Sequence, residues 1–392
     1  MKIYIVADTI YPDMKLRKVY FDNSATTAVA SEVLEAMMPF LTSEYGNPSS
    51  VHFMGNMAAK GVRTARAQIA DTLNSLPSEI TFTSGGTESD NLALIGTMTA
   101  LSETGSDKKR IVTTCIEHEA VLEACEELRR RGFETTVLGV DSEGYLDPSA
   151  LDDVMGDDVG LVSVMAANNV VGTIEDISEL SKVSHEYGAL FHTDAVQGYT
   201  KMSIDVRKDG IDLLSLSGHK IHAPKGTGAL FVKSGTPILP ISFGGGQERG
   251  LRSSTENVPG IVGLGKAAEL ATSTMDDDIR MMTKLRDEII DDMLGIEGAH
   301  LNGPMGERRL CNNTHFRFDG SKGMDMVIAL SGKGIAVSAA SACSAGSSEP
   351  SYVLTSLGLT PEQCMSALRI SLSRYNTEDD VRYLSETMRS FL

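Results

Sequence analysis

Residues 215–232, SLSGHKIHAPKGTGALFV, join two short apolar runs through a glycine-rich turn that carries basic side chains. Both runs predict β-strands, and Lys220 follows directly after the first of them. A lysine at a strand end is normally just solvated. Here Ser217 and His219 lie beside it, and their hydroxyl and imidazole groups can bind a phosphate next to a covalently reactive amine. The stretch therefore predicts an α/β fold with a ligand site at a strand end.

The pattern from about residue 56 to 232 alternates short apolar runs with amphipathic, helix-like stretches. Such alternation is typical of an α/β fold with a mostly parallel sheet, with helices between most of the strands. The predicted strands are ITFTS (80–84), RIVTT (110–114), GLVSVMA (160–166), ALFHTD (189–194), DLLSLSG (212–218) and GALFV (228–232).

The last third of the chain has a different pattern. Residues 259–297 predict one long helix that can be kinked, with Pro259 in its first turn. Beyond it, shorter strands and helices predict a small α+β domain, and a chain of 392 residues is long enough for two domains. The expected parts are an N-terminal extension (1–18), a large domain (19–275) whose first segment (19–30) can pack with the small domain, and a small C-terminal domain (276–392). Met14 offers an alternative translation start, so residues 1–13 can be an extension of the natural chain.

Charge and cysteine usage exclude several classes of protein. The chain has 35 Lys and Arg against 53 Asp and Glu, and its net charge of −18 opposes nonspecific binding to nucleic acid or anionic membranes. It has neither a long apolar run nor a signal-peptide pattern. The 5 cysteines form no CxxC pair and no zinc-type spacing, and an odd number cannot all pair within one chain. We therefore expect a cytoplasmic protein without direct nucleic-acid, membrane or metal binding.

A second polar position closes the predicted strand 189–194. Asp194 ends this strand, and Gln197 follows it in FHTDAVQG. The carboxyl ends of parallel strands line the ligand crevice of open α/β sheets, where a carboxylate can keep a pyridine nitrogen protonated. Asp194 can equally be a helix cap. Its position 26 residues before Lys220, each at a strand end, favours a shared site.

Two further strand ends carry polar groups. Gly85 and Gly86 lead into a helix that opens at Thr87, and the free backbone N–H groups of such a turn suit a phosphate. A plain N-cap turn explains the same residues. His118 lies between strand 110–114 and the next helix, where an imidazole can stack on a ligand ring and move protons, although a lone histidine is more often structural.

Cys343 is the candidate reactive thiol. It lies in SAASACSAGSSEPS (338–351), a run of small and polar residues that predicts an exposed loop, where a structural cysteine has nothing to pack against. Cys115, Cys125 and Cys364 fall within patterned elements and are expected to be buried, and Cys311 stays ambiguous.

Nine segments in order carry a resemblance to a known family: YFDNSATT (20–27), YGNPSSVH (45–52), FTSGGTESDN (82–91), EHEAVLEAC (117–125), HTDAVQ (192–197), SGHKIHAPKG (217–226), RGLRSSTEN (249–257), SACSAGSSEPSYVL (341–354) and ALRISLSRYNTEDD (367–380). Together they resemble the cysteine desulfurases of the NifS/IscS type, within the class V aminotransferase superfamily. The resemblance covers nearly the whole chain from about residue 19. It implies the fold type I of pyridoxal 5′-phosphate (PLP) transferases, in which helices flank a mostly parallel seven-stranded-type sheet and a small α+β domain follows.

The resemblance also implies PLP as cofactor and gives roles to the residues that hold it. Lys220 would form the Schiff base, Asp194 would pair with the pyridine nitrogen, His118 would stack on the ring, and Gln197 would bond the phenolic oxygen. The remaining cofactor-binding positions, mostly around the phosphate, would be Gly86, Thr87, Asn169, Ser217 and His219.

Further implied roles concern the substrate and the assembly. Thr255 would reach the phosphate of a neighbouring subunit, so the site would need a homodimer. Asn169 and Arg369 would lie near the substrate, with Arg369 gripping its α-carboxylate. Lys220 and His118 would act on the substrate together with Cys343, the sulfur acceptor.

The implied reaction converts L-cysteine to L-alanine and leaves the sulfur on Cys343 as a persulfide. The small-residue loop agrees with the subgroup that delivers sulfur to acceptor proteins, such as an iron–sulfur scaffold or a sulfur carrier, for iron–sulfur cluster assembly or tRNA thiolation. A selenocysteine lyase, another class V aminotransferase and a non-catalytic assembly partner are the alternatives. The sequence departs from the family pattern at Val170 and Glu175 in NNVVGTIED (168–176), where we expect altered contacts around the site.

Overall fold

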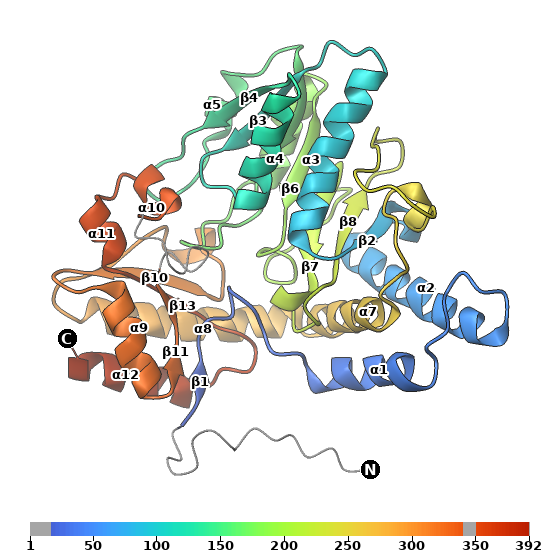
Figure 1. Ribbon diagram of the computed structural model, residues 1–392. Helices are drawn as coiled ribbons and strands as arrows, with labels where there is room; N and C mark the ends of the chain where they lie inside the picture. Colours follow the sequence, from blue (N-terminus) through green and yellow to red (C-terminus); the bar gives the residue numbers. More distant parts are fainter. Residues whose placement is uncertain (1–16, 340–349, 392) are drawn as a thin grey trace.

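The computed structural model describes residues 17–339 and 350–391 and is built around a seven-stranded sheet (Figure 1). The strand order is β2-β8-β7-β6-β5-β3-β4. All strands run in the same direction except β8, which is antiparallel to both its neighbours. The mostly parallel sheet predicted from the sequence is therefore confirmed. Its strands are β2 (Ile80–Thr83), β3 (Arg110–Thr114), β4 (Glu134–Leu138), β5 (Val159–Ser163), β6 (Leu190–Asp194), β7 (Leu213–Ser217) and β8 (Gly228–Val232).

Helices cover both faces of this sheet. Successive strand residues point to opposite faces: Leu213 packs in a core with residues of two helices, α3 and α4, whereas Leu214 packs in the core formed with α2, α6 and α7. Burial on both sides explains why the central strands are rich in apolar residues. Within the described residues, no helix is both long and apolar enough to span a bilayer. The helices are α1 (Ser31–Thr42), α2 (Phe53–Leu73), α3 (Gly86–Glu103), α4 (Glu119–Arg130), α5 (Pro148–Asp152), α6 (Ile177–Glu186) and α7 (Val258–Ser273).

The C-terminal part has a separate antiparallel sheet in the order β12-β13-β10-β9. Its strands are β9 (Ala299–Leu301), β10 (Asn313–Phe318), β12 (Ser338–Ala339) and β13 (Ala367–Ser371). Its helices are α8 (Met275–Leu294), α9 (Gly323–Gly332), α10 (Tyr352–Ser356), α11 (Pro361–Met365) and α12 (Glu378–Phe391). The start of the chain joins this part, because β1 (Val19–Tyr20) pairs in parallel with β11 (Ile335–Ala336) and Phe21 packs in the same core.

The long helix predicted over 259–297, for which a kink was allowed, is interrupted at one residue. The chain forms two helices, α7 and α8 (Figure 1). Thr274 lies between them with a non-helical backbone, where φ is −122° and ψ is 8°. Three successive hydroxyl side chains explain the break, since Thr272, Ser273 and Thr274 bond to carbonyl oxygens of the preceding turn and compete with the backbone. We propose that the boundary between the large and the small domain lies at this break, near residue 275.

Candidate active site

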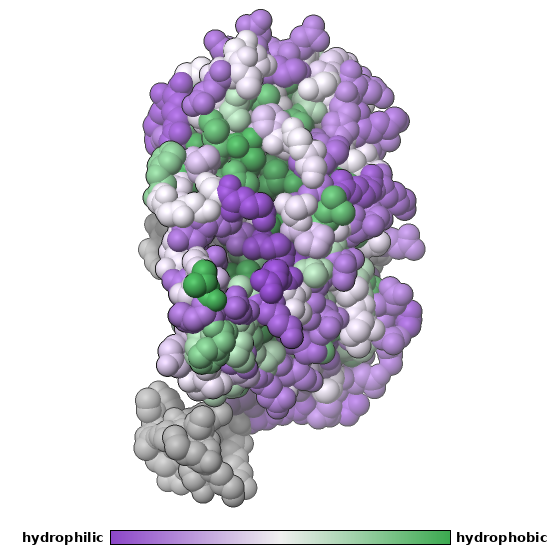
Figure 2. Space-filling model, turned by 90° about the vertical axis from the view of Figure 1, so that its right-hand side faces the viewer, coloured by the Kyte–Doolittle hydropathy of each residue, from purple (hydrophilic) through white to green (hydrophobic). Residues whose placement is uncertain are grey.

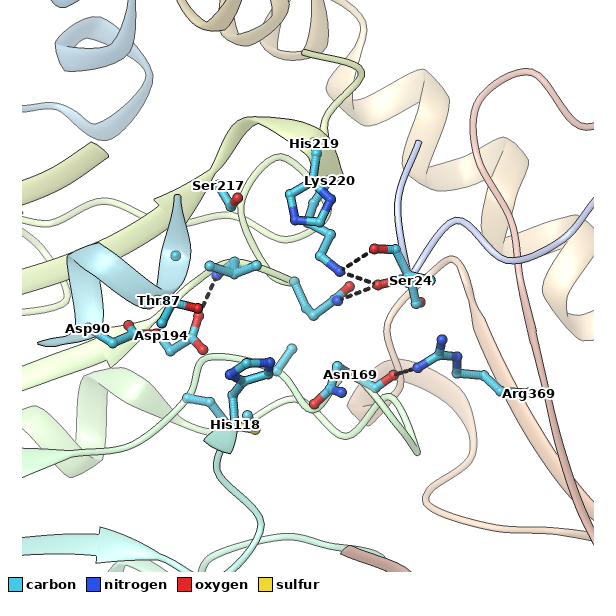
Figure 3. Close-up of a pocket in the computed structure, with 16 residues that line it drawn as sticks. Ser24, Thr87, Asp90, His118, Asn169, Asp194, Ser217, His219, Lys220 and Arg369 are labelled. Carbon is cyan, nitrogen blue, oxygen red and sulfur yellow. Dashed lines mark hydrogen bonds between the residues drawn. The ribbon is translucent and has the colours of Figure 1, made fainter. Parts of the chain in front are cut away.

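A cavity of about 320 Å³ opens where β3, β5, β6 and β7 end, beside the N-terminus of α3 (Figure 3). Parallel strands end at the same edge of a sheet, so residues distant in sequence converge there. A volume of this size suits a small ligand or cofactor. The predicted site residues that line the cavity are Gly86, Thr87, His118, Asn169, Asp194, Gln197, Ser217, His219, Lys220 and Arg369.

Asp194 forms one wall of the cavity at the end of β6. Its carboxylate accepts a hydrogen bond from the backbone nitrogen of Val196 at 2.8 Å, and the residue is 5% exposed. Burial raises the pKa of Asp194, while the neighbouring His118 and Lys220 lower it. A buried carboxylate is costly without a cationic partner, so Asp194 is suited to hold a positively charged group of a ligand.

Lys220 reaches the cavity from the short 3-10 turn η2 (Gly218–Lys220) that follows β7. Its amine donates hydrogen bonds to the carbonyl oxygens of Ser24 and Ala25, the latter at 2.9 Å (Figure 3). The amide of Gln197 donates to the same Ser24 oxygen at 3.0 Å. Two side chains from separate loops are thus oriented by one backbone segment. Ser24 and Ala25 belong to the motif YFDNSATT (20–27), but their residue types alone do not indicate this role.

The first turn of α3 and the residues around Lys220 form a polar end of the cavity. Gly86 and Thr87 open α3, where backbone N–H groups have no helical partner and suit an anion. Burial and nearby lysines lower the pKa of His219 to about 4, so its imidazole is neutral at pH 7. Its Nδ1 lies 3.2 Å from the Thr26 hydroxyl. Together with the Ser217 hydroxyl, these groups can surround a phosphate.

His118 lies across the cavity from Lys220 (Figure 3). It is the N-cap residue of α4, and its Nδ1 accepts a hydrogen bond from the backbone nitrogen of Ala120 at 3.1 Å. This contact assigns the proton of the neutral ring to Nε2. The local structure therefore fixes both the orientation and the tautomer of an imidazole that can stack on a planar ligand and exchange a proton.

Arg369 reaches the cavity from β13 of the C-terminal sheet. Its guanidinium donates to the backbone oxygen of Asn169 at 2.9 Å and to the carboxylate of Asp22 at 3.0 Å. The side chain is 6% exposed, and its Nε is buried without a hydrogen-bond partner among the described residues. Since the guanidinium has five N–H donors in a planar fork, donors remain to bind a carboxylate.

Comparison with known proteins agrees with this geometry. The family model for class V aminotransferases matches residues 19–384. The chain belongs to this family. The cysteine desulfurase IscS of Methanosarcina thermophila is 47% identical over 372 residues, which cover 95% of this chain and 91% of that protein. The IscS of Dictyoglomus turgidum (strain DSM 6724 / Z-1310) is 45% identical over 377 residues, which cover 96% of this chain and 95% of that protein. A solved NifS-like protein has a TM-score of 0.89 at 40% identity, covering 96% of this chain and 100% of its own. The resemblance to the NifS/IscS type is therefore confirmed.

Class V aminotransferases of this type use PLP, and PLP is the cofactor of this protein. The cavity fits this molecule. It offers the amine of Lys220 for the aldehyde, the buried carboxylate of Asp194 for the ring nitrogen, and the helix N-terminus at Gly86 and Thr87 for the phosphate. A larger residue than glycine at position 86 would not fit, because a Cβ there would lie 2.7 Å from Cγ2 of Val196.

Asp22 offers a test of how this class V aminotransferase binds the substrate's carboxylate. Asp22→Ala frees one edge of the Arg369 guanidinium, so we expect the KM for L-cysteine to rise about tenfold, the effect of losing one hydrogen bond to a charged group. We expect kcat to change less, and steady-state kinetics with varied L-cysteine measures both. Asp22→Asn keeps an acceptor oxygen, so its KM for L-cysteine should fall between the values of the natural protein and of Asp22→Ala. An unchanged KM in Asp22→Ala would show that Asp22 does not orient Arg369.

Two predicted site residues do not line the cavity. Thr255 is exposed in the loop between β8 and α7. Cys343 lies outside the described residues, so its position stays a prediction. Both flanks of its segment are attached close to the cavity, because Ser338 pairs with Arg369 in the sheet and the Tyr352 hydroxyl donates to the backbone oxygen of Glu117 at 2.6 Å.

The cavity also contains residues that sequence analysis missed. They are Ser24, Ala25, Asp90, Met165, Ala167 and Val196. Asp90 had a usable signal: it follows Gly86 by four residues, which places both on one face of a helix, and it precedes the apolar run LALIG. A carboxylate on that face is expected to be buried at the site.

The family departures at Val170 and Glu175 lie outside the cavity lining. The backbone nitrogen of Val170 donates to the Asn168 side chain at 2.8 Å. One carboxylate oxygen of Glu175 accepts from the backbone nitrogen of Leu146 at 3.1 Å, and the other is buried without a partner among the described residues. The departures therefore alter contacts behind the cavity, and the neighbouring Asn169 still lines it.

Glu175 should make the stability of this class V aminotransferase depend on pH. Burial raises the pKa of Glu175 from 4.5 to about 8. Between these pKa values the folded state binds more protons than the unfolded state. The contribution of Glu175 to the free energy of unfolding is therefore fully present below pH 4.5 and is lost as pH rises towards 8. In the natural protein we expect Glu175 to lower the free energy of unfolding by roughly 4 kcal/mol between pH 5 and 8.5, and Glu175→Gln should remove this fall. Thermal unfolding over this pH range measures it. The exposed Glu186 on α6 provides the control, since Glu186→Gln should leave the pH dependence as it is. Equal slopes in all three proteins would contradict the prediction.

Proposed function

We propose that this protein is a PLP-dependent cysteine desulfurase, which takes sulfur from L-cysteine onto Cys343 as a persulfide and releases L-alanine. One observation carries the proposal: Lys220, Asp194 and Arg369 line one cavity in a chain that is 47% identical to a cysteine desulfurase. The first two fit the cofactor and the third fits the carboxylate of an amino acid.

The residues around the cavity divide the work. When bound, PLP draws electrons from the α-carbon of an attached amino acid. Lys220, which the carbonyl oxygens of Ser24 and Ala25 orient, removes the α-proton as a general base. Asp194 stays anionic and keeps the ring nitrogen protonated. Arg369 holds the substrate's carboxylate, which fixes the α-hydrogen relative to the base.

Cys343 completes the reaction. Its thiolate attacks the sulfur of the substrate, so that a sulfur–sulfur bond forms and the carbon–sulfur bond breaks. The electron pair of the broken bond passes to the substrate carbon, which takes up a proton and becomes the methyl group of alanine. The persulfide then passes its sulfur to an acceptor, such as an iron–sulfur scaffold or a sulfur carrier.

Two observations support Cys343 over the three buried cysteines, whereas Cys115, which was expected to be buried, is only half-buried. Burial raises the pKa of Cys125 to about 12 and that of Cys311 to about 11, and Cys364 is buried as well. Thiols of this kind form little thiolate at neutral pH. Ala339, four positions before Cys343 in the sequence, ends β12, and β12 pairs with the strand that carries Arg369.

We also infer a homodimer. Three large apolar side chains on the segment around the start of α2 are strongly exposed in the single chain: Tyr45 at 73%, Val51 at 93% and Phe53 at 72%. Figure 2 shows islands of apolar side chains in a mainly hydrophilic surface on the side that carries α2. Such exposed groups mark interfaces, and a partner there would allow Thr255 to complete the phosphate end of a neighbouring cavity. Analytical ultracentrifugation should give twice the chain mass of 42.0 kDa. A fully active monomer would contradict the dimer.

Alanine release separates the proposed activity from its alternatives. The purified protein is incubated with L-cysteine or with selenocysteine, and alanine is measured together with sulfur on the protein. A cysteine desulfurase gives alanine from cysteine and one bound sulfur per turnover before an acceptor is added. A selenocysteine lyase gives alanine only from selenocysteine. An aminotransferase forms neither product in this way, and a non-catalytic assembly partner would not hold PLP covalently.

Asp194→Asn tests the proposed electrostatic role of Asp194. The neutral amide cannot hold the ring nitrogen protonated, so we expect the variant to bind PLP but to remove the α-proton about 100-fold or more slowly. The rate of hydrogen–deuterium exchange at the α-carbon of the substrate measures this step. Glu119→Gln, an exposed carboxylate at the start of α4, is the control and should exchange at the normal rate. A normal exchange rate in Asp194→Asn would contradict the role.

A further inference from the structure

Asp90 places a second buried carboxyl group beside Asp194 (Figure 3). It lies on α3 one turn after Gly86, lines the same cavity and has a side chain that is 2% exposed. A third acidic group, Glu117, is fully buried nearby. Like charges at close range in a dry environment cannot all ionise, because each carboxylate penalises the next.

Two hydrogen bonds hold a buried histidine, His192, beside Asp90 in the interior of the sheet. Nδ1 of His192 lies 2.8 Å from the Ser163 hydroxyl, and Nε2 lies 3.0 Å from the Ser215 hydroxyl. Asp90 comes next to this histidine, since its Oδ1 lies 3.7 Å from Nε2 of His192. Burial lowers the pKa of His192 to about 3, so this histidine is neutral and carries a single ring proton.

The direction of the donors follows from the tautomer of His192. If the proton of His192 is on Nε2, it is donated to Ser215, whose own hydrogen is then available for Asp90, while Ser163 donates to Nδ1. Oδ1 of Asp90 is buried without a hydrogen-bond partner among the described residues and lies 3.7 Å from Nε2 of His192. Asp90 therefore has a buried oxygen with no donor to stabilise a negative charge on it, which favours the neutral carboxylic acid.

The charges around the site agree with a protonated Asp90. Burial, and next the neighbouring Asp194, raise the pKa of Asp90 well above its ordinary value. His118 and Lys220 act on Asp194 and favour its anionic form. The cationic ring nitrogen proposed to face Asp194 supplies one positive charge, which balances one carboxylate and not two.

We propose that Asp90 is a positioning residue that stays a neutral carboxylic acid and directs its proton at the carboxylate of Asp194. It would hold Asp194 in one orientation and stabilise the anion without adding a second negative charge. This inference rests on the role proposed for Asp194 and adds a residue, Asp90, to which sequence analysis gave no function.

Two substitutions in the PLP-loaded protein test the inference. Asp90→Asn keeps an acceptor for Ser215 and a donor for Asp194, so kcat should stay within about threefold of the natural protein and its pH profile should be unchanged. Asp90→Ala removes the donor, so kcat should fall about tenfold and the acidic limb of the kcat/KM profile should move up by about one pH unit. A purely structural role would lower thermal stability without moving the profile. If Asp90→Asn and Asp90→Ala shift the pH profile of kcat/KM equally, the inference is overturned.

Infrared spectroscopy of the PLP-loaded protein provides a test that does not depend on activity. At pH 7 the difference spectrum between the natural protein and Asp90→Asn should show the loss of one carbonyl stretch of a protonated carboxyl group. Glu175→Gln is the matched control, since it removes another buried carboxyl group remote from the cavity and should leave the kcat profile unchanged. Loss of a carboxylate band instead would show that Asp90 is ionised and would overturn the inference, even if the desulfurase activity itself is present.

Discussion

Lys220→Ala is expected to abolish covalent attachment of PLP and to lower turnover by at least about 1,000-fold, since one amine both bonds the cofactor and moves the α-proton. Among the described residues, no other lysine lines the cavity. Borohydride reduction followed by peptide mass spectrometry measures the attachment, and alanine release measures the turnover.

Lys225 provides the matched control for this experiment. It lies five residues further along the chain and lines a neighbouring hollow with Gly86, Thr87 and His219. Lys225→Ala should keep the borohydride-fixed cofactor on the peptide that contains position 220. Fixed cofactor on a different lysine in Lys220→Ala would overturn the assignment of the covalent residue.

Cys343→Ala should separate the activation of the substrate from the transfer of its sulfur. The variant keeps all the groups that line the cavity, so it should bind PLP and exchange the α-proton of cysteine at close to the normal rate. Alanine formation should nevertheless fall by at least about 1,000-fold, because a nearby thiolate is needed to attack the sulfur. Proton exchange and alanine are measured on the same sample.

The other cysteines serve as controls for Cys343. Cys115→Ala should retain turnover, and substitution of the buried Cys125, Cys311 or Cys364 should cost stability of about 1–3 kcal/mol without loss of sulfur transfer. Normal alanine formation by Cys343→Ala, together with a requirement for one of these four, would identify a different nucleophile.

The sequence predicted the central strands well because they are buried on both faces. Burial makes β5 to β8 rich in apolar residues, and the polar residues at the ends of β6 and β7 mark the edge of the sheet where ligands bind. The edge strand β4 was missed, since ETTVL is polar and largely open to solvent. Pattern alone does not distinguish such a strand from a loop.

The parts of the site that were missed depend on contacts that sequence does not display. Ser24 and Ala25 act through backbone oxygens, which leave no trace in residue type. Asp90 looks like an ordinary polar residue in a helix until the sheet buries it beside Asp194. Thr272, Ser273 and Thr274 ended a helix that apolar periodicity alone would have continued. In each case tertiary structure or local side-chain bonding decided the outcome.

Mass spectrometry of the protein after incubation with L-cysteine identifies the residue that accepts the sulfur. The natural chain is treated with L-cysteine, thiols are alkylated without reduction, and peptides are sequenced. The account predicts one added sulfur on the peptide that contains Cys343, absent from Lys220→Ala and from protein incubated with L-alanine. Added sulfur on the peptide of Cys115, Cys125, Cys311 or Cys364, or alanine release with no sulfur on any cysteine, would contradict it.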